Sequence, residues 1–212
     1  MSAVTATSWN LCAGGLAGSI YSLAIDPVTP SIIYAGSYNS DSSGSVFKST
    51  DGGSNWTKSN SGLTGEAIQT LAIDPVTTST VYAGVRNKGV FKSTDGGTNW
   101  TPTTIASTWA FAVVIDPATP STVYAATNLS GVYKSTDRGS KWTQINSGLP
   151  SYVLELTIDP STTSIIYAGT AAGAFKSTDG GSKWTPINSG LTDLNVITHP
   201  LYHICRNSCG HI

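Results

Sequence analysis

Few acidic side chains in this chain are placed where they could do chemistry. Twelve Asp and Glu residues occur among 212 residues, and eight of these lie in two repeated turn phrases described below. The carboxylates outside those phrases belong to Asp41, Glu66, Glu155 and Asp193. Hydrolysis of a glycosidic bond needs two carboxylates, one on each side of the scissile bond. These four residues are therefore the catalytic candidates, although each could equally be a solvated loop residue.

Glu155 differs from the other three because it lies in an apolar run, between Leu154 and Leu156. The equivalent position in the other repeats of the chain is occupied by Ser22, Thr70 and Ala112. A carboxylate on a strand of this kind is expected to have a perturbed pKa, which is a common property of functional sites.

The histidines and most of the cysteines gather near the C-terminus, where His199, His203 and His211 accompany Cys205 and Cys209. Their spacing matches no common zinc motif, and we expect neither a metal site nor a cofactor. Two alternatives stay open. A disulfide from Cys12 to Cys205 or Cys209 would join the chain ends, or residues 201–212 form an irregular tail with free thiols.

One eight-residue phrase organises the elements that must position these side chains. It begins at Ser49 and recurs after intervals of 44, 42 and 42 residues, a period typical of propellers and solenoids. Short alternating apolar runs flank each copy, which predicts a tight turn between two strands. The Asp can accept hydrogen bonds from its own turn, and the Gly tolerates positive φ. The shared positions are Ser49, Asp51, Gly53 and Trp56; Ser93, Asp95, Gly97 and Trp100; Ser135, Asp137, Gly139 and Trp142; and Ser177, Asp179, Gly181 and Trp184.

The phrase Ser-x-Asp-x-Gly-x-x-Trp resembles the Asp-box (BNR) repeat of sialidases, sortilin-type receptors, xyloglucan-active glycoside hydrolases and photosystem II assembly factors, which are all β-propellers. All four copies match at the defining positions, and the nearest departure is Arg138, where the other copies carry Gly. The resemblance implies a structural role for these residues, on the face away from the usual active site. Each Trp is expected to pack between neighbouring repeats, since one sheet cannot bury it alone.

We therefore expect an all-β propeller of four-stranded antiparallel blades, with four complete blades and a split or partial fifth. An Asp-Pro phrase after each first strand predicts the next turn. The expected blades span residues of about 20–60, 66–105, 109–147 and 152–189, and the partial blade takes residues 8–14 and 194–200. Residues 1–200 would form one domain. If strands from both chain ends share the fifth blade, the ring closes as a monomer; otherwise the chain is an oligomer or part of a larger propeller.

Propeller geometry predicts a ligand-binding face opposite the repeated phrases. The loops expected there carry Tyr38, Asn39, Arg86, Asn87, Trp109, Phe111 and Tyr152. Aromatic rings stack on the apolar faces of sugars while polar groups fix orientation, so this set suits a carbohydrate or a protein ligand. In the alternative interpretation, Trp109 and Phe111 simply plug the top of the sheet.

Composition excludes several classes of function. Charged residues make up 11% of the chain and the net charge is −1, so there is no basic footprint for a nucleic acid. No apolar run is long enough for a membrane span, and residues 1–7 lack the features of a signal peptide. The low charge content favours an extracellular or periplasmic protein.

The leading functional hypothesis is a non-catalytic scaffold that binds a carbohydrate or a protein. The alternative is part of a glycoside hydrolase, either xyloglucanase-like or sialidase-like. Sialidases use three clustered arginines, whereas the arginines here are Arg86, Arg138 and Arg206, and Arg138 belongs to a repeated phrase on the other face. The sialidase-like reading is therefore disfavoured.

Overall fold

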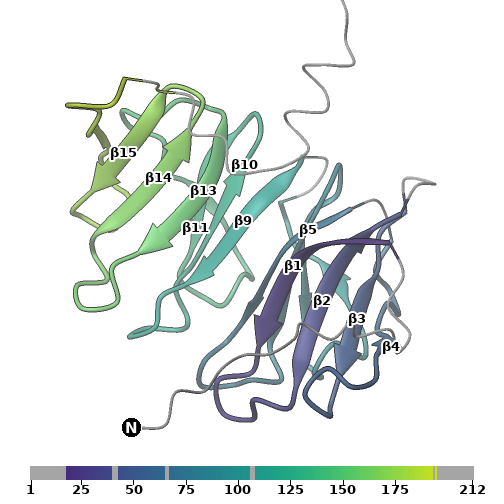
Figure 1. The fold of residues 1–212 in the computed structure, drawn as a ribbon. Helices are drawn as coiled ribbons and strands as arrows, with labels where there is room; N and C mark the ends of the chain where they lie inside the picture. The colour runs from purple at the N-terminus through teal and green to yellow at the C-terminus, as the bar shows by residue number, and fades with distance from the viewer. Residues whose placement is uncertain (1–17, 40–42, 65–66, 106–107, 193, 195–212) are drawn as a thin grey trace, which may run out of the picture.

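Sixteen short strands form four separate sheets in the computed structural model, which describes residues 18–39, 43–64, 67–105, 108–192 and 194. Each sheet contains four consecutive strands in antiparallel order (Figure 1). The strands are β1 (Ser19–Ile25), β2 (Ile33–Tyr38), β3 (Val46–Ser49) and β4 (Thr57–Lys58); β5 (Ile68–Ile73), β6 (Val81–Val85), β7 (Gly89–Ser93) and β8 (Thr101–Pro102); β9 (Ala110–Ile115), β10 (Val123–Thr127), β11 (Gly131–Ser135) and β12 (Thr143–Gln144); and β13 (Val153–Ile158), β14 (Ile166–Thr170), β15 (Gly173–Ser177) and β16 (Thr185–Pro186). This is the predicted all-β propeller with four-stranded blades.

The four blades, numbered 1 to 4 in chain order, stand in a row. Their first strands are neighbours in the order β1, β5, β9 and β13, and blades 1 and 4 lie at opposite ends of the row (Figure 1). Within the described part of the chain, no helix has the length and apolar character needed to cross a membrane. The expected partial fifth blade, apart from Leu194, lies outside the described residues, as do all the cysteines and histidines.

Each blade places two turns on the same face. The Asp-Pro turn after β1 is fixed by the Asp26 carboxylate, which accepts the N–H groups of Val28 and Thr29 at 2.8 and 3.0 Å. The repeat turn, meaning the eight-residue phrase between the third and fourth strands, is joined to it because Gly52 N–H donates to the Ser31 carbonyl. The same bond recurs in the other three blades, from Gly96 to Ser79, Arg138 to Ser121 and Gly180 to Ser164. We call this face the lower face and the opposite one the upper face.

The repeat turns are closed by local side-chain bonds. The Ser93 hydroxyl accepts the Gly97 N–H at 2.9 Å and donates to Asp95 at 2.8 Å, and Asp95 also accepts the Asn99 N–H at 2.8 Å. The turn of blade 3 keeps the corresponding bonds although Arg138 replaces Gly there, with φ of 55°. Arg138 also pairs with Asp74 of blade 2 at 3.3 Å, so the departure from the pattern adds an ion pair between blades.

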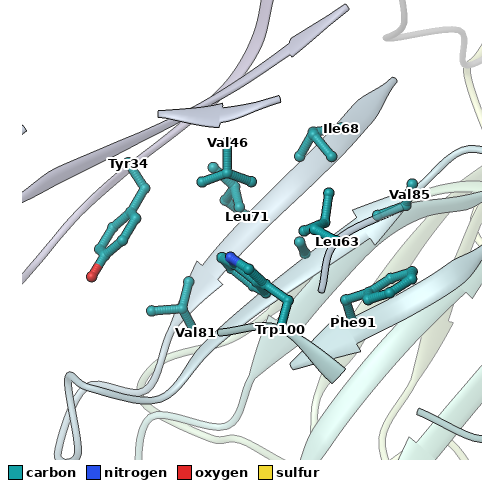
Figure 2. Close-up of a cluster of buried hydrophobic side chains, with 10 residues drawn as sticks. Tyr34, Val46, Leu63, Ile68, Leu71, Val81, Val85, Phe91 and Trp100 are labelled. Carbon is teal, nitrogen blue, oxygen red and sulfur yellow. The ribbon is translucent and has the colours of Figure 1, made fainter. Parts of the chain in front are cut away.

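The indole N–H of the repeat-turn Trp bonds the preceding blade in two of the four cases. Trp100 is 2% exposed and packs with Tyr34 and Val46 of blade 1 (Figure 2). Its indole N–H donates to the Ser59 carbonyl of that blade at 2.7 Å, and Trp184 bonds Ile145 of blade 3 in the same way. Trp56 and Trp142 instead donate to Gly53 and Gly139 of their own turns, although Trp142 still packs against the cluster that contains Tyr82 of blade 2. For Trp142 the reason is in the sequence, since blade 2 lacks the Asn-Ser-Gly-Leu segment that follows the fourth strand of blades 1 and 3.

Candidate functional site

A β-bulge occurs at the same place in every first strand, near its upper end. The pairing with the second strand shifts at Tyr21, Gln69, Phe111 and Leu154. A bulge leaves one residue out of the ladder and re-aims its side chain, and bulges are frequent beside functional sites. Phe111 is among the residues predicted from the sequence to bind a ligand, whereas Tyr21 and Gln69 are not. Alignment of the repeats on Phe111 could have found both.

Aromatic side chains of blades 1, 3 and 4, together with one arginine of blade 2, line the upper face in a series that we call the upper aromatic row. In blade 1, the rings of Tyr21 and Tyr38 stack with centroids 5.8 Å apart. The Arg86 guanidinium of blade 2 lies 4.1 Å from the centroid of Trp109 in blade 3, a cation–π geometry. Phe111 then meets Trp109 edge-on at 5.7 Å and Tyr152 of blade 4 at 5.9 Å. The row consists of Tyr21, Tyr38, Arg86, Trp109, Phe111 and Tyr152.

Arg86 connects the two aromatic groups electrostatically. Burial and the neighbouring Tyr38 raise the pKa of Tyr21, whereas the Arg86 charge opposes this rise. The Arg86 guanidinium, which stacks on the indole of Trp109, provides a polar donor beside the apolar rings of the row.

Asparagines fix the loops that carry the row. Asn87 adopts φ of 59° and its side chain accepts the indole N–H of Trp109. The Asn128 side chain accepts the Trp109 backbone N–H at 3.3 Å, and the Trp109 carbonyl accepts the Asn128 N–H at 3.1 Å. Asn39 donates to Ser43 at 2.9 Å within the loop after β2. The predicted ligand-binding residues are therefore brought together on one face, by bonds that hold Trp109 in a defined orientation.

Exposure separates the members of the row that can meet a ligand from those that fill the core. Phe111 is 7% exposed, so the plug interpretation describes it well. Trp109, Tyr38 and Tyr152 are only half-buried. The plug interpretation thus describes Phe111, whereas Trp109 keeps part of its surface accessible.

Gln69 lies at the bulge of blade 2 and is 4% exposed, and neither atom of its amide has a hydrogen-bond partner among the described residues.

Glu155 occupies the position that the repeats predict. It pairs with Gly169, just as Ser22 pairs with Gly36 and Thr70 with Gly84. Part of the Glu155 side chain reaches solvent, but desolvation of the carboxyl by the surrounding residues raises its pKa. The Leu156 N–H, which donates to the carboxylate at 3.2 Å, partly opposes this rise. Asp41, Glu66 and Asp193 lie outside the described residues. Within the described ranges, no cluster of three His, Cys, Asp or Glu side chains could hold a metal ion.

A hollow lies at the lower ends of the first strands. It has a volume of about 430 Å³ and is lined by apolar residues that include Ile25, Ile73 and Ile115 and the prolines of three Asp-Pro turns. No charged side chain lines it. Because binding sites combine apolar walls with a few polar groups, the upper aromatic row fits a ligand site better than this hollow.

Comparison with known proteins gives a family and several similar folds. The family model for the DUF6242 beta propeller domain matches residues 31–189. No curated protein matches the chain. Solved structures similar to the chain include an ancestral GH74 enzyme, with 22% identity, a TM-score of 0.73 and coverage of 86% of this chain and 26% of that one.

Two further structures are informative. The GH74 enzyme of Niastella koreensis is 32% identical, with a TM-score of 0.66 and coverage of 77% of this chain and 28% of its own. YCF48 bound to D1 peptide is 14% identical, with a TM-score of 0.64 and coverage of 85% and 58%. The chain thus spans about a quarter of the length of the GH74 structures and somewhat more than half of YCF48.

Proposed function

The chain belongs to the family of the DUF6242 beta propeller domain, and from this premise we propose that it is a non-catalytic binding propeller that holds an extended carbohydrate chain across its upper face. The observation that carries the proposal is the upper aromatic row, which runs over all four blades. Its half-buried rings offer flat apolar surfaces, while Arg86 and the asparagines offer polar groups. This combination suits a polymer of sugars, whose units present an apolar face and a polar edge.

The likeness to GH74 structures supports the choice of ligand class. The structure from Niastella koreensis is 32% identical, and the repeats of this chain resemble those of xyloglucan-active enzymes in sequence. The low charge content, 11% of residues, favours a place outside the cytoplasm, where polysaccharides are available. Xyloglucan oligosaccharides are therefore the first probe.

Titration calorimetry with a xyloglucan oligosaccharide tests the proposal. Trp109→Ala removes a ring that stacks on Arg86, and we expect it to weaken binding about tenfold or more. Leu129→Ala is the matched control, because Leu129 is 72% exposed in the loop between β10 and β11 and lies outside the row. Equal affinities for Trp109→Ala and the unchanged chain would overturn the proposal, and so would binding of peptides but of no oligosaccharide.

The second candidate function is part of a glycoside hydrolase. It is favoured by the 32% identity to a GH74 enzyme and by the raised pKa of Glu155, which suits a general acid. Release of reducing sugar from xyloglucan, abolished by Glu155→Gln, would establish this function in place of the first. Binding without release, unchanged by Glu155→Gln, supports the non-catalytic role.

A further inference from the structure

Neighbouring blades are joined by the same pair of side chains at every internal junction. In blade 1, the Tyr34 hydroxyl and the Lys48 ammonium both donate to the Gly96 carbonyl in the repeat turn of blade 2, at 2.9 and 2.8 Å. Blade 2 holds Arg138 of blade 3 through Tyr82 and Lys92 at 2.9 and 2.8 Å, and blade 3 holds Gly180 of blade 4 through Tyr124 and Lys134 at 3.3 and 3.0 Å. We call each Tyr and Lys a junction pair. A blade therefore offers donors on one side and an acceptor on the other.

Backbone bonds complete two of the three junctions. The Trp100 N–H donates to the Ser61 carbonyl of blade 1 at 2.8 Å, and its indole N–H donates to Ser59. Trp184 makes the same two bonds to Ser147 and Ile145 of blade 3. The side chain of Leu63, two residues after Ser61, is 9% exposed under this contact.

Blade 4 carries a complete donor side that nothing in the described structure covers. The ammonium of Lys176 lies 5.5 Å from the ring centroid of Tyr167, close to the 5.4 Å between Lys48 and Tyr34. Among the described residues neither Tyr167 nor Lys176 has an acceptor, and Tyr167 is partly exposed where Tyr34 is 1% exposed. Leu191, the counterpart of Leu63, is 46% exposed. Tyr167 and Lys176 thus have the geometry of a junction pair, and the neighbouring apolar side chain of Leu191 is open to solvent.

Blade 1 carries the matching acceptor side. A Cβ placed on Gly52 would meet nothing within 4 Å, whereas one on Gly96 would lie 3.1 Å from the Lys48 ammonium. Trp56, which has no described blade before it, turns its indole N–H to Gly53 of its own turn. The two ends of the row are therefore complementary halves of one more junction.

Neither segment outside the described ends carries the residue types of the half that its end of the row lacks. Residues 1–17 contain neither Tyr nor Lys, and residues 195–212 contain neither Asp nor Trp. Within the described structure, Lys176 makes no bond to Gly52 of the same chain. A second copy of this chain carries both halves, the Tyr167–Lys176 pair at one end and the uncovered Gly52 turn at the other.

We propose that copies of this chain associate head to tail, with the Tyr167–Lys176 junction pair of one copy bonded to the Gly52 carbonyl of the next. A contact between two different surfaces of the same molecule closes into a ring or continues as a filament. Two copies joined at both ends give eight blades, within the usual range for propellers. This association is independent of the carbohydrate proposed above.

The test is the solution mass of the full chain over a range of concentrations by sedimentation velocity. We expect a concentration-dependent dimer, and Lys176→Glu should raise its dissociation constant about tenfold or more because a charge-assisted hydrogen bond is lost. Lys183→Glu makes the same charge change on an exposed residue outside the junction and should leave the mass unchanged. Tyr167→Phe with Lys176→Met removes both donors, keeps the apolar bulk, and should act like Lys176→Glu.

A single-copy mass at all concentrations overturns the proposal, and so does a dimer insensitive to both sets of junction variants. The partner is identified by amine-to-carboxylate coupling in a mixture of unlabelled and ¹⁵N-labelled chains. A link from Lys176 to Asp51 that joins the two isotopes supports a second copy. The same link only within one isotope means that the row closes on itself and overturns the proposal.

Discussion

At the scale of the residue, the carboxylate of each repeat turn is exposed to solvent and yet strongly held. Asp95 accepts the backbone N–H and the side-chain amide of Asn99 and the hydroxyl of Ser93, and these bonds lower its pKa to about 2. Asp137 has Lys141 in place of the Asn, so its pKa is lowered chiefly by the Lys141 backbone bond and the Ser135 hydroxyl, with smaller effects of the Ser140 backbone and the Lys141 charge. The side-chain amides of Asn55 and Asn99 thus explain why the pKa values of Asp51 and Asp95 are lowered to about 2.

These shifts predict a loss of stability in acid. The pKa of Asp95 in the folded chain, about 2, lies below its ordinary value of 3.8. The stabilisation is therefore complete above pH 3.8 and disappears as the pH falls through 2. Asp95→Asn should lower the urea midpoint at pH 7 and match the unchanged chain near pH 2. Asp137→Asn should show the same trend with a smaller effect, and a pH-independent difference would contradict the assignment.

The indole at a junction gives a second prediction at this scale. Trp100 is almost completely buried between blades 1 and 2, and Trp100→Ala should lower the free energy of unfolding by about 3–5 kcal/mol. Trp142→Ala should cost less, because Trp142 is partly exposed and bonds its own turn. Urea unfolding measures both, and a loss below about 1 kcal/mol for Trp100→Ala would exclude the interlocking role.

At the scale of the element, the bulged first strand is the feature that shapes the upper face. Four bulges in register place Tyr21, Gln69, Phe111 and Leu154 at equivalent points. Three of these side chains are apolar or aromatic, and Gln69 is the exception. An amide at this depth without a partner among the described residues lowers the stability of the fold.

Gln69 therefore predicts a stabilising substitution. Gln69→Met keeps the volume and removes the unsatisfied amide, and we expect the free energy of unfolding to rise by about 1 kcal/mol. Gln144→Met is the control, because the exposed Gln144 amide in β12 has partners in the Ser130 carbonyl and the Tyr133 hydroxyl, and this substitution should not raise stability. A clear loss of stability in Gln69→Met would show that the amide already has a partner in solution.

At the scale of the whole molecule, the blades form a row in which each contacts only its neighbours. Blades 2 and 3 are covered on both sides, whereas blades 1 and 4 each have one open side within the described structure. In such arrays stability is approximately the sum of the repeats and their junctions. The inner blades should consequently be the most stable part of the chain.

Hydrogen exchange tests this order. Amides of β6 and β10, in blades 2 and 3, should exchange more slowly than those of β14 in blade 4 when the chain is dilute. At high concentration, head-to-tail association should slow exchange in β14 selectively. Equal protection of all blades in dilute solution would contradict the row as described.

Much of this protein is determined by short stretches of sequence. The repeat turns and the Asp-Pro turns are closed by bonds between residues no more than four apart, so the phrases themselves predict the strands, the blades and the face that carries each loop. The order of strands and turns along the chain was enough to predict that Tyr38, Arg86, Trp109 and Tyr152 lie at the upper ends of the strands or in the loops there.

Only the tertiary structure decided the rest, because it depends on contacts between residues dozens of positions apart. The stacking of Arg86 on Trp109, the bulges that bring Tyr21 and Gln69 to the upper face, and the different partners of Trp100 and Trp142 arise from how sheets pack. So does the complementarity of the two ends: Lys176 looks the same as Lys48 in the sequence, and only the packing shows that one has an acceptor and the other has none among the described residues.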